Sequence, residues 1–210
     1  MDSIRELFKI GYGPSSSHTM GPRKASEIFL GRNKNAGSFR ITLYGSLAAT
    51  GKGHLTDQAI LSVLQPVAPT QMIFEPSIEL PFHPNGMKFE ALDATGKKTN
   101  EWTTYSFGGG TLSDGNKQEN ASKQSLYNFH TIEEIKKWCE KNGSAYWEYV
   151  EQNEGSDIWD YMKEIWDVMR DSVTRGLEKE GVLPGGLGLR RKASDYLIKA
   201  KGYDGSLKNR

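Results

Sequence analysis

In four segments of the sequence, which we call frames, polar side chains are flanked by glycine or proline. They are His18 and Thr19 before Gly21-Pro22, Lys52 and His54 on either side of Gly53, His83 and Asn85 between Pro81 and Gly86, and Ser106 before Gly108-Gly109-Gly110. Imidazole, hydroxyl, amide and ammonium groups transfer protons and bind anions, and stiff loops at strand ends hold such groups in place. Histidines in three such frames indicate one convergent pocket.

The first of these segments, residues 11–19, places several hydroxyl groups where a helix is expected to begin. The start of a helix suits a carboxylate or a phosphate, because the backbone amides and the positive end of the helix dipole point toward it. The same hydroxyl groups can instead cap and bond their own turn. The physics of the loop leaves these two interpretations equal.

The spacing of the residues argues against two familiar kinds of active site. A nucleotide-binding P-loop needs four residues between its glycines and Ser or Thr after its lysine. Here five residues separate Gly45 from Gly51, and Gly53 follows Lys52. A serine hydrolase needs a nucleophile elbow, Gly-x-Ser-x-Gly, and the sequence around Ser17 does not have that form.

Cysteine usage limits the chemistry further. The chain has one cysteine, Cys139, which excludes an intrachain disulfide and any metal or iron–sulfur site built from several thiolates of this chain alone. Its neighbours Ile135, Trp138 and Tyr146 indicate a small buried thiol facing the core.

The elements that must position the four segments alternate between strands and helices. Strands are predicted at 39–44, from 72 toward 80, at 87–92 and at 101–107, and helices after Gly21-Pro22, after Thr56, from Thr131 to about 143, and over 158–177. Residues 45–54 are predicted to be a loop, and residues 113–128 an exposed connection. The sequence therefore predicts an α+β fold with helices packed on a mostly antiparallel sheet, followed by the helical start of a second domain.

Composition excludes some partners. With 27 Lys+Arg against 26 Asp+Glu, the net charge of +1 gives no argument for a nucleic acid or an anionic membrane. The 210 residues are 36% hydrophobic, which suits a globular chain of one domain or one domain plus a fragment. The sequence shows no signal segment and no apolar run of about 18 residues, so we expect a soluble, cytoplasmic protein.

The glycine–serine segment and three later blocks resemble the β region of bacterial iron–sulfur L-serine dehydratases. The first block reads Ile10-Gly11-Tyr12-Gly13-Pro14-Ser15-Ser16-Ser17-His18-Thr19-Met20-Gly21-Pro22, and the others are residues 44–57, 83–87 and 105–110. A fifth block, residues 180–187 with 190–193, is similar to the opening of the α region of the same enzymes. The resemblance implies a β domain over 1–150 and the helical, incomplete beginning of a cluster-binding α domain over 151–210.

The resemblance also implies an activity, a cofactor and partners. The activity is deamination of L-serine to pyruvate and ammonia without pyridoxal phosphate. The cofactor is a [4Fe-4S] cluster that acts as a Lewis acid and is ligated by cysteines absent from this chain. The partners are the substrate, L-serine, and the α region or a separate α chain, and we expect a homo-oligomer.

Roles for individual residues follow from the same resemblance. His54 is expected to be the catalytic base, because neutral imidazole accepts a proton near pH 7. His18, the second catalytic residue, is expected to line the pocket with Ser16, Ser17 and Thr19, which hold the substrate carboxylate. Asn85 and Ser106 are expected to hydrogen-bond the substrate or the base, and Lys52 to supply charge to the carboxylate.

An alternative from another class stays open. The β region of these enzymes resembles the allosteric substrate-binding domain of some phosphoglycerate dehydrogenases. A lone β domain could therefore be a non-catalytic regulatory module that binds an amino acid or another small anion.

Overall fold

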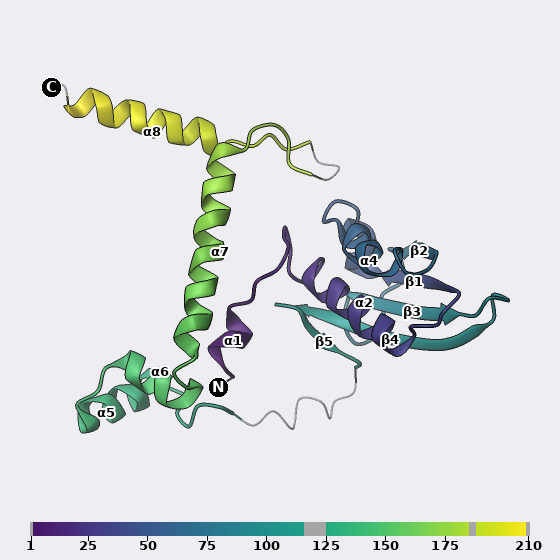
Figure 1. Ribbon diagram of the computed structural model, residues 1–210, viewed down its shortest axis with the longest axis horizontal. Helices are drawn as coiled ribbons and strands as arrows, with labels where there is room; N and C mark the ends of the chain where they lie inside the picture. Colours follow the sequence, from purple (N-terminus) through teal and green to yellow (C-terminus); the bar gives the residue numbers. More distant parts are fainter. Residues whose placement is uncertain (1, 116–124, 185–187, 209–210) are drawn as a thin grey trace. The chain divides into compact units, whose positions relative to one another are not determined.

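A computed structural model describes residues 2–115, 125–184 and 188–208 of the chain (Figure 1). Within these ranges the chain forms two compact units. The sheet unit comprises residues 11–115, and the helical unit comprises residues 2–10, 125–184 and 188–208. No helix in the described ranges is long and apolar enough to cross a membrane.

The sheet unit is built on five strands in the order β2-β1-β3-β4-β5. Their bounds are β1 Ser38–Tyr44, β2 Thr70–Glu75, β3 Gly86–Leu92, β4 Lys98–Gly108 and β5 Thr111–Ser113. Only β1 and β2 pair in parallel, because two helices carry the chain between them, and the other neighbouring pairs are antiparallel. The prediction of an α+β fold with a mostly antiparallel sheet is confirmed.

One face of the sheet packs against helices. They are α2 Met20–Arg32, α3 Gly45–Thr50 and α4 Thr56–Leu64. Phe39, Ile41 and Leu43 alternate along β1 and are buried against this layer, as the period-two pattern predicts. Phe29 of α2 and Ile60 of α4 complete the core with full burial, and a side chain of this size contributes about 1.5–3 kcal/mol when buried.

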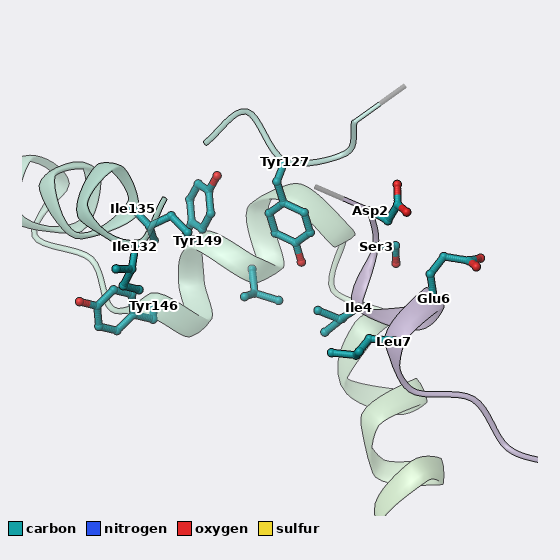
Figure 2. A pocket seen from close by; sticks show the side chains of 11 residues that line it. Asp2, Ser3, Ile4, Glu6, Leu7, Tyr127, Ile132, Ile135, Tyr146 and Tyr149 are labelled. Carbon is teal, nitrogen blue, oxygen red and sulfur yellow. The ribbon is translucent and has the colours of Figure 1, made fainter. Parts of the chain in front are cut away.

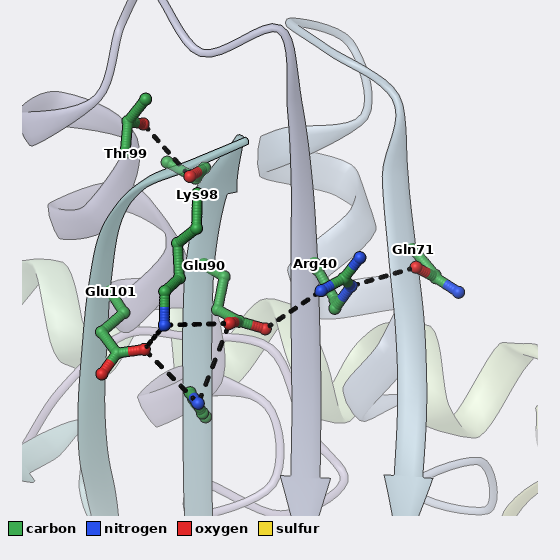
Figure 3. A network of polar contacts seen from close by, with 8 residues as sticks. Arg40, Gln71, Glu90, Lys98, Thr99 and Glu101 are labelled. Carbon is green, nitrogen blue, oxygen red and sulfur yellow. Dashed lines mark hydrogen bonds and ion pairs between the residues drawn. The ribbon is translucent and has the colours of Figure 1, made fainter. Parts of the chain in front are cut away.

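Charged side chains occupy the other face of the sheet (Figure 3). Glu90 lies at its centre, with its carboxylate 3.8 Å from Arg40, 3.8 Å from Lys88 and 3.7 Å from Lys98. Lys98 and Lys88 also pair with Glu101, which is opposite Glu90 in the register of β3 and β4. The lysines thus offset the repulsion between two carboxylates that face each other across strands.

The helical unit contains the remaining helices. They are α1 Ile4–Leu7, α5 Ile132–Asn142, α6 Tyr146–Glu154, α7 Ile158–Glu178 and α8 Ala193–Lys208. Thr131 and Glu134 form the capping box predicted for α5, and α7 coincides with the predicted helix over 158–177. Glu154 joins the N-terminal segment to this unit, because its carboxylate accepts hydrogen bonds from Ser3 Oγ at 2.6 Å, the Ile4 amide at 2.8 Å and Tyr127 Oη at 2.7 Å.

Several elements differ from the prediction. Strand β2 ends at Glu75 instead of continuing toward residue 80, and helix α6 was not predicted. Residues 45–50, predicted to be part of a loop, form helix α3, because Leu47 and Ala48 are buried in the core and this burial outweighs the low helix propensity of the glycines. Strand β5 was not predicted, and it begins at Thr111, directly after the triple glycine. Of the connection predicted at 113–128, residues 116–124 lie outside the described ranges.

The boundary predicted at residue 150 concerns the two regions of the resembling enzymes and stays a prediction. The compact units divide the chain elsewhere, since α1, α5 and α6 group with α7 and α8.

Candidate active site

The four glycine- and proline-framed segments meet at one edge of the sheet. The end of β1 lies beside the start of β3, since Leu43 pairs with Met87, and the end of β4 lies beside the same point, since Gly86 pairs with Tyr105. The turn before α2 reaches this edge too, because the Gly109 amide donates a hydrogen bond to Ser16 Oγ at 3.0 Å. All eight predicted site residues belong to the sheet unit.

The serine turn, residues 15–19, is already helical where it leads into α2. The Thr19 amide donates to the Ser15 carbonyl at 2.8 Å, and the His18 amide donates to the same oxygen at 3.1 Å. Thr19 is buried, and its hydroxyl lies 2.5 Å from the Tyr12 carbonyl and 2.6 Å from that of Ser15. Thr19 therefore holds the turn together, while the proton of Ser16 remains able to donate to a ligand.

The imidazole rings of His18 and His54 lie side by side, with centroids 4.6 Å apart and planes inclined by 43°. Each ring has its own polar contacts. His18 Nδ1 lies 3.0 Å from Ser17 Oγ, and His18 Nε2 lies 3.0 Å from Thr50 Oγ1. His54 Nδ1 lies 3.1 Å from the Thr50 carbonyl oxygen. The structure thus brings together the two histidines predicted to be catalytic.

The surroundings of His18 favour its neutral form. Burial of the ring and the neighbouring His54 lower the pKa of His18 below its usual value, against the backbone carbonyl of Ser46, which favours the protonated ring. Two close imidazoles cannot both carry a charge without repulsion. His18 is therefore held in its neutral form beside His54.

Asn85 and Ser106 form a buried polar pair next to the serine turn. Asn85 Nδ2 donates to the Ser106 carbonyl at 3.1 Å, and the Ser106 amide donates to the Asn85 carbonyl at 3.0 Å. Ser106 is fully buried, and its hydroxyl oxygen has no hydrogen-bond partner within the described part of the chain. A buried hydroxyl of this kind is costly to leave unpaired, so it is suited to a polar ligand atom.

Lys52 and His83 lie at the margin of this group. Lys52 is exposed, and its Nζ lies 5.2 Å from the centroid of the Phe74 ring, so the structure shows it against β2 rather than in the histidine pair. His83 Nδ1 accepts a hydrogen bond from the Asn85 amide at 3.1 Å, and its ring lies 4.4 Å from that of Phe107. His83 therefore supports the position of Asn85.

The helical unit has a separate, apolar pocket of about 540 Å³ (Figure 2). Its walls are mainly aliphatic and tyrosine side chains, among them Ile4, Leu7, Ile135, Tyr146 and Tyr149. Among the described residues, the polar groups that line it are those of Asp2, Ser3, Glu6 and the tyrosines, and none of the predicted site residues lies there.

Comparison with known proteins identifies the family of the chain. A family model described as serine dehydratase beta chain matches residues 3–72 and 63–117, which contain every residue of the site described above. The chain belongs to the serine dehydratase beta chain family.

Members of the serine dehydratase family resemble the chain over most of its length. The L-serine dehydratase of Streptomyces coelicolor is 34% identical over 95% of this chain and 55% of its own length. L-serine dehydratase TdcG of Escherichia coli is 33% identical over 92% of this chain and 53% of its own length. The chain thus spans about half the length of the curated relatives it matches.

The iron–sulfur cluster that the sequence resemblance leads us to expect does not fit the residues of this chain. Its one cysteine, Cys139, is buried in the helical unit beside Tyr127 and Tyr149. No three His, Cys, Asp or Glu side chains gather as metal ligands in the ranges that the structure describes. A cluster with several thiolate ligands needs cysteines from outside these 210 residues.

Two residues of this candidate site are absent from the sequence-based prediction. Thr50 contacts both histidines, and Gly21 faces the Ser106 hydroxyl. Thr50 stands four residues before His54, which is about one helical turn. In a helix, this spacing brings the carbonyl of the first residue near the side chain of the second, so a helix predicted at this position would have indicated the contact between Thr50 and His54. Gly21 was noted only as part of the frame of His18.

Proposed function

We propose that this chain supplies the proton-transfer and carboxylate-binding half of an L-serine dehydratase, which converts L-serine to pyruvate and ammonia. The observation that carries the proposal is the contact between His18 and His54 at the sheet edge, with ring centroids 4.6 Å apart, beside the serine turn. The names of the relatives supply the substrate and the reaction.

The roles of the residues follow from their positions. His54 accepts the α-proton of serine, a step for which a neutral imidazole is suited near pH 7. Ser16 and Ser17 bind the substrate carboxylate at the start of α2, and Thr19 keeps their turn in shape. Asn85 and Ser106 hydrogen-bond the substrate, since the Ser106 hydroxyl is buried and unpaired among the described residues. Lys52, at the margin of this group, adds its positive charge to the carboxylate from a longer distance.

The overall reaction needs no further reactant. Removal of the α-proton and loss of the β-hydroxyl leave aminoacrylate and water, and hydrolysis of the corresponding imine then gives pyruvate and ammonia. A [4Fe-4S] cluster as Lewis acid belongs to an α region or α chain that brings the cysteines. We propose a homo-oligomeric, cytoplasmic enzyme assembled from these parts.

The test combines this chain with a candidate α chain, purified without oxygen, and measures pyruvate release with L-serine. We expect His54→Asn to lower kcat by about 100-fold or more, which is the scale of general base catalysis. His130→Asn is the matched control, because His130 lies in the helical unit outside the site. Near-normal kcat for His54→Asn would refute the role of His54 as base.

A regulatory module is the second candidate, favoured by the confinement of all eight site residues to the sheet unit. Such a module binds an amino acid or another small anion without turnover. Calorimetry of the chain alone with L-serine, together with absence of pyruvate when the α chain is added, would favour the module over the enzyme.

A further inference from the structure

We propose that Thr50 is a positioning residue that fixes which nitrogen carries the proton on both histidines, through its carbonyl for His54 and its hydroxyl for His18. The inference rests on the proposed function only for its consequence in catalysis, since the hydrogen-bond pattern itself is a property of this chain. It follows from the donors and acceptors around one residue at the end of α3.

The carbonyl of Thr50 determines the tautomer of His54. A carbonyl oxygen can only accept, so the contact of 3.1 Å between it and His54 Nδ1 requires a proton on Nδ1. In a neutral ring the lone pair is then on Nε2. His54 Nε2 is therefore the atom that accepts the substrate proton, and the carbonyl stabilises the imidazolium that results.

The hydroxyl of Thr50 contributes to the tautomer of His18, together with the Ser46 carbonyl, which also acts on this ring. Its single proton is donated to the Ser46 carbonyl at 2.8 Å, so toward His18 the oxygen can only accept. The contact of 3.0 Å therefore requires a proton on His18 Nε2. Nδ1 of the neutral ring then accepts from a serine hydroxyl, since the hydroxyl oxygens of Ser17 and Ser15 lie 3.0 Å and 3.3 Å from it.

The two histidines are thus held in opposite tautomers by the same residue. His18 presents an N–H toward Thr50 and cannot take a proton at that nitrogen, whereas His54 keeps a free lone pair on Nε2. This difference assigns the base role to one ring of a pair whose centroids are only 4.6 Å apart.

Two substitutions distinguish the contact of the Thr50 hydroxyl with His18 from the contact of its carbonyl with His54. Thr50→Val keeps the shape and the backbone carbonyl and removes only the hydroxyl, so it breaks the contact with His18 and spares that with His54. Thr50→Ser keeps both groups and is the matched control. Thr50 is exposed, so neither change disturbs the core.

The experiment measures nitrogen-15 spectra of the full chain labelled at histidine, without substrate or α chain. The chain has four histidines, and single His→Asn variants assign their signals. We expect a protonated Nε2 on neutral His18 and a protonated Nδ1 on neutral His54. Thr50→Val should give mixed tautomers at His18 alone, and Thr50→Ser should match the parent chain. In the assembled enzyme, kcat of Thr50→Val should fall about tenfold, the effect of one net hydrogen bond.

A protonated Nδ1 on His18 of the parent chain would overturn the proposal, as would an unchanged His18 tautomer in Thr50→Val. The parent spectrum decides even where a variant fails to fold. These spectra require no turnover. They can therefore refute the role of Thr50 without refuting the serine dehydratase activity, and an inactive enzyme does not refute the role of Thr50.

Discussion

The hydroxyl oxygen of Ser106 lies 2.0 Å from the point that a Cβ atom at Gly21 would occupy. Helix α2 and strand β4 can approach this closely only because residue 21 has no side chain. We expect Gly21→Ala to cost about 1–3 kcal/mol of the free energy of unfolding, since the clash involves a fully buried side chain.

Gly31 is the control for this change, because it lies in the same helix and a Cβ there would meet nothing within 4 Å. Gly31→Ala should stabilise the chain by up to about 1 kcal/mol through helix propensity. Urea unfolding of both variants makes the comparison, and equal stabilities for the two would refute the close contact at Gly21.

The pH dependence of stability should reveal the lowered pKa of His18. Burial and His54 lower this pKa in the folded chain, so the unfolded chain binds a proton more readily than the folded chain does. The stability that results is present above the unfolded pKa, about 6.5, and decreases as the pH falls from there toward the folded pKa. Urea unfolding at pH 7.5 and at pH 5.5 should show a smaller decrease for His18→Asn than for the parent chain. Equal decreases in the two proteins would contradict this account.

Glu154 should control the N-terminal segment of the helical unit. Glu154→Gln replaces an ionised acceptor of three hydrogen bonds, from Ser3, Ile4 and Tyr127, by a neutral one, and we expect a loss of about 1–2 kcal/mol. Amide hydrogen exchange of residues 4–8 should speed up, with little change in β1. Glu164→Gln, on the exposed side of α7, is the control. Unchanged exchange at residues 4–8 would show that Glu154 does not hold this segment.

Glu90 should be more important than Glu101 for the charged face of the sheet. The Glu90 side chain is 12% exposed and faces three cations, whereas that of Glu101 is 48% exposed. Glu90→Gln should cost about 1–2 kcal/mol at low ionic strength, because it removes the carboxylate charge that Arg40, Lys88 and Lys98 share. The cost should shrink in 1 M salt, which screens the remaining repulsion. A larger cost for Glu101→Gln than for Glu90→Gln would reverse this ranking.

Much of the fold of both units follows from local patterns. The alternation of Phe39, Ile41 and Leu43 predicts β1 and its buried face, and the capping box at Thr131 predicts the start of α5. These signals lie within a few residues of the chain, where periodicity and capping chemistry act. The histidine frames also predict a shared pocket, and the structure brings His18 and His54 together.

The parts that sequence reasoning missed depend on contacts over longer distances. Helix α3 forms in a glycine-rich segment because Leu47 and Ala48 enter a core made by other elements. Without that helix, nothing in the sequence places Thr50 against both histidines. In the same way, Gly21 and Ser106 are far apart in sequence, and only the packing of α2 on the sheet brings them into contact.

The hydrogen bonds of Glu154 to Ser3 and Ile4 determine an order of events during synthesis on the ribosome. Every residue of the sheet unit through Gly115 leaves the ribosome before Glu154 does, and domains generally fold as units while the chain is being made. The sheet unit can therefore complete its core, with both histidines in place, before Glu154 is available to bind the N-terminal segment. A chain truncated between residues 115 and 154 and released from the ribosome should already protect β1 and β3 from exchange and leave residues 4–8 unprotected.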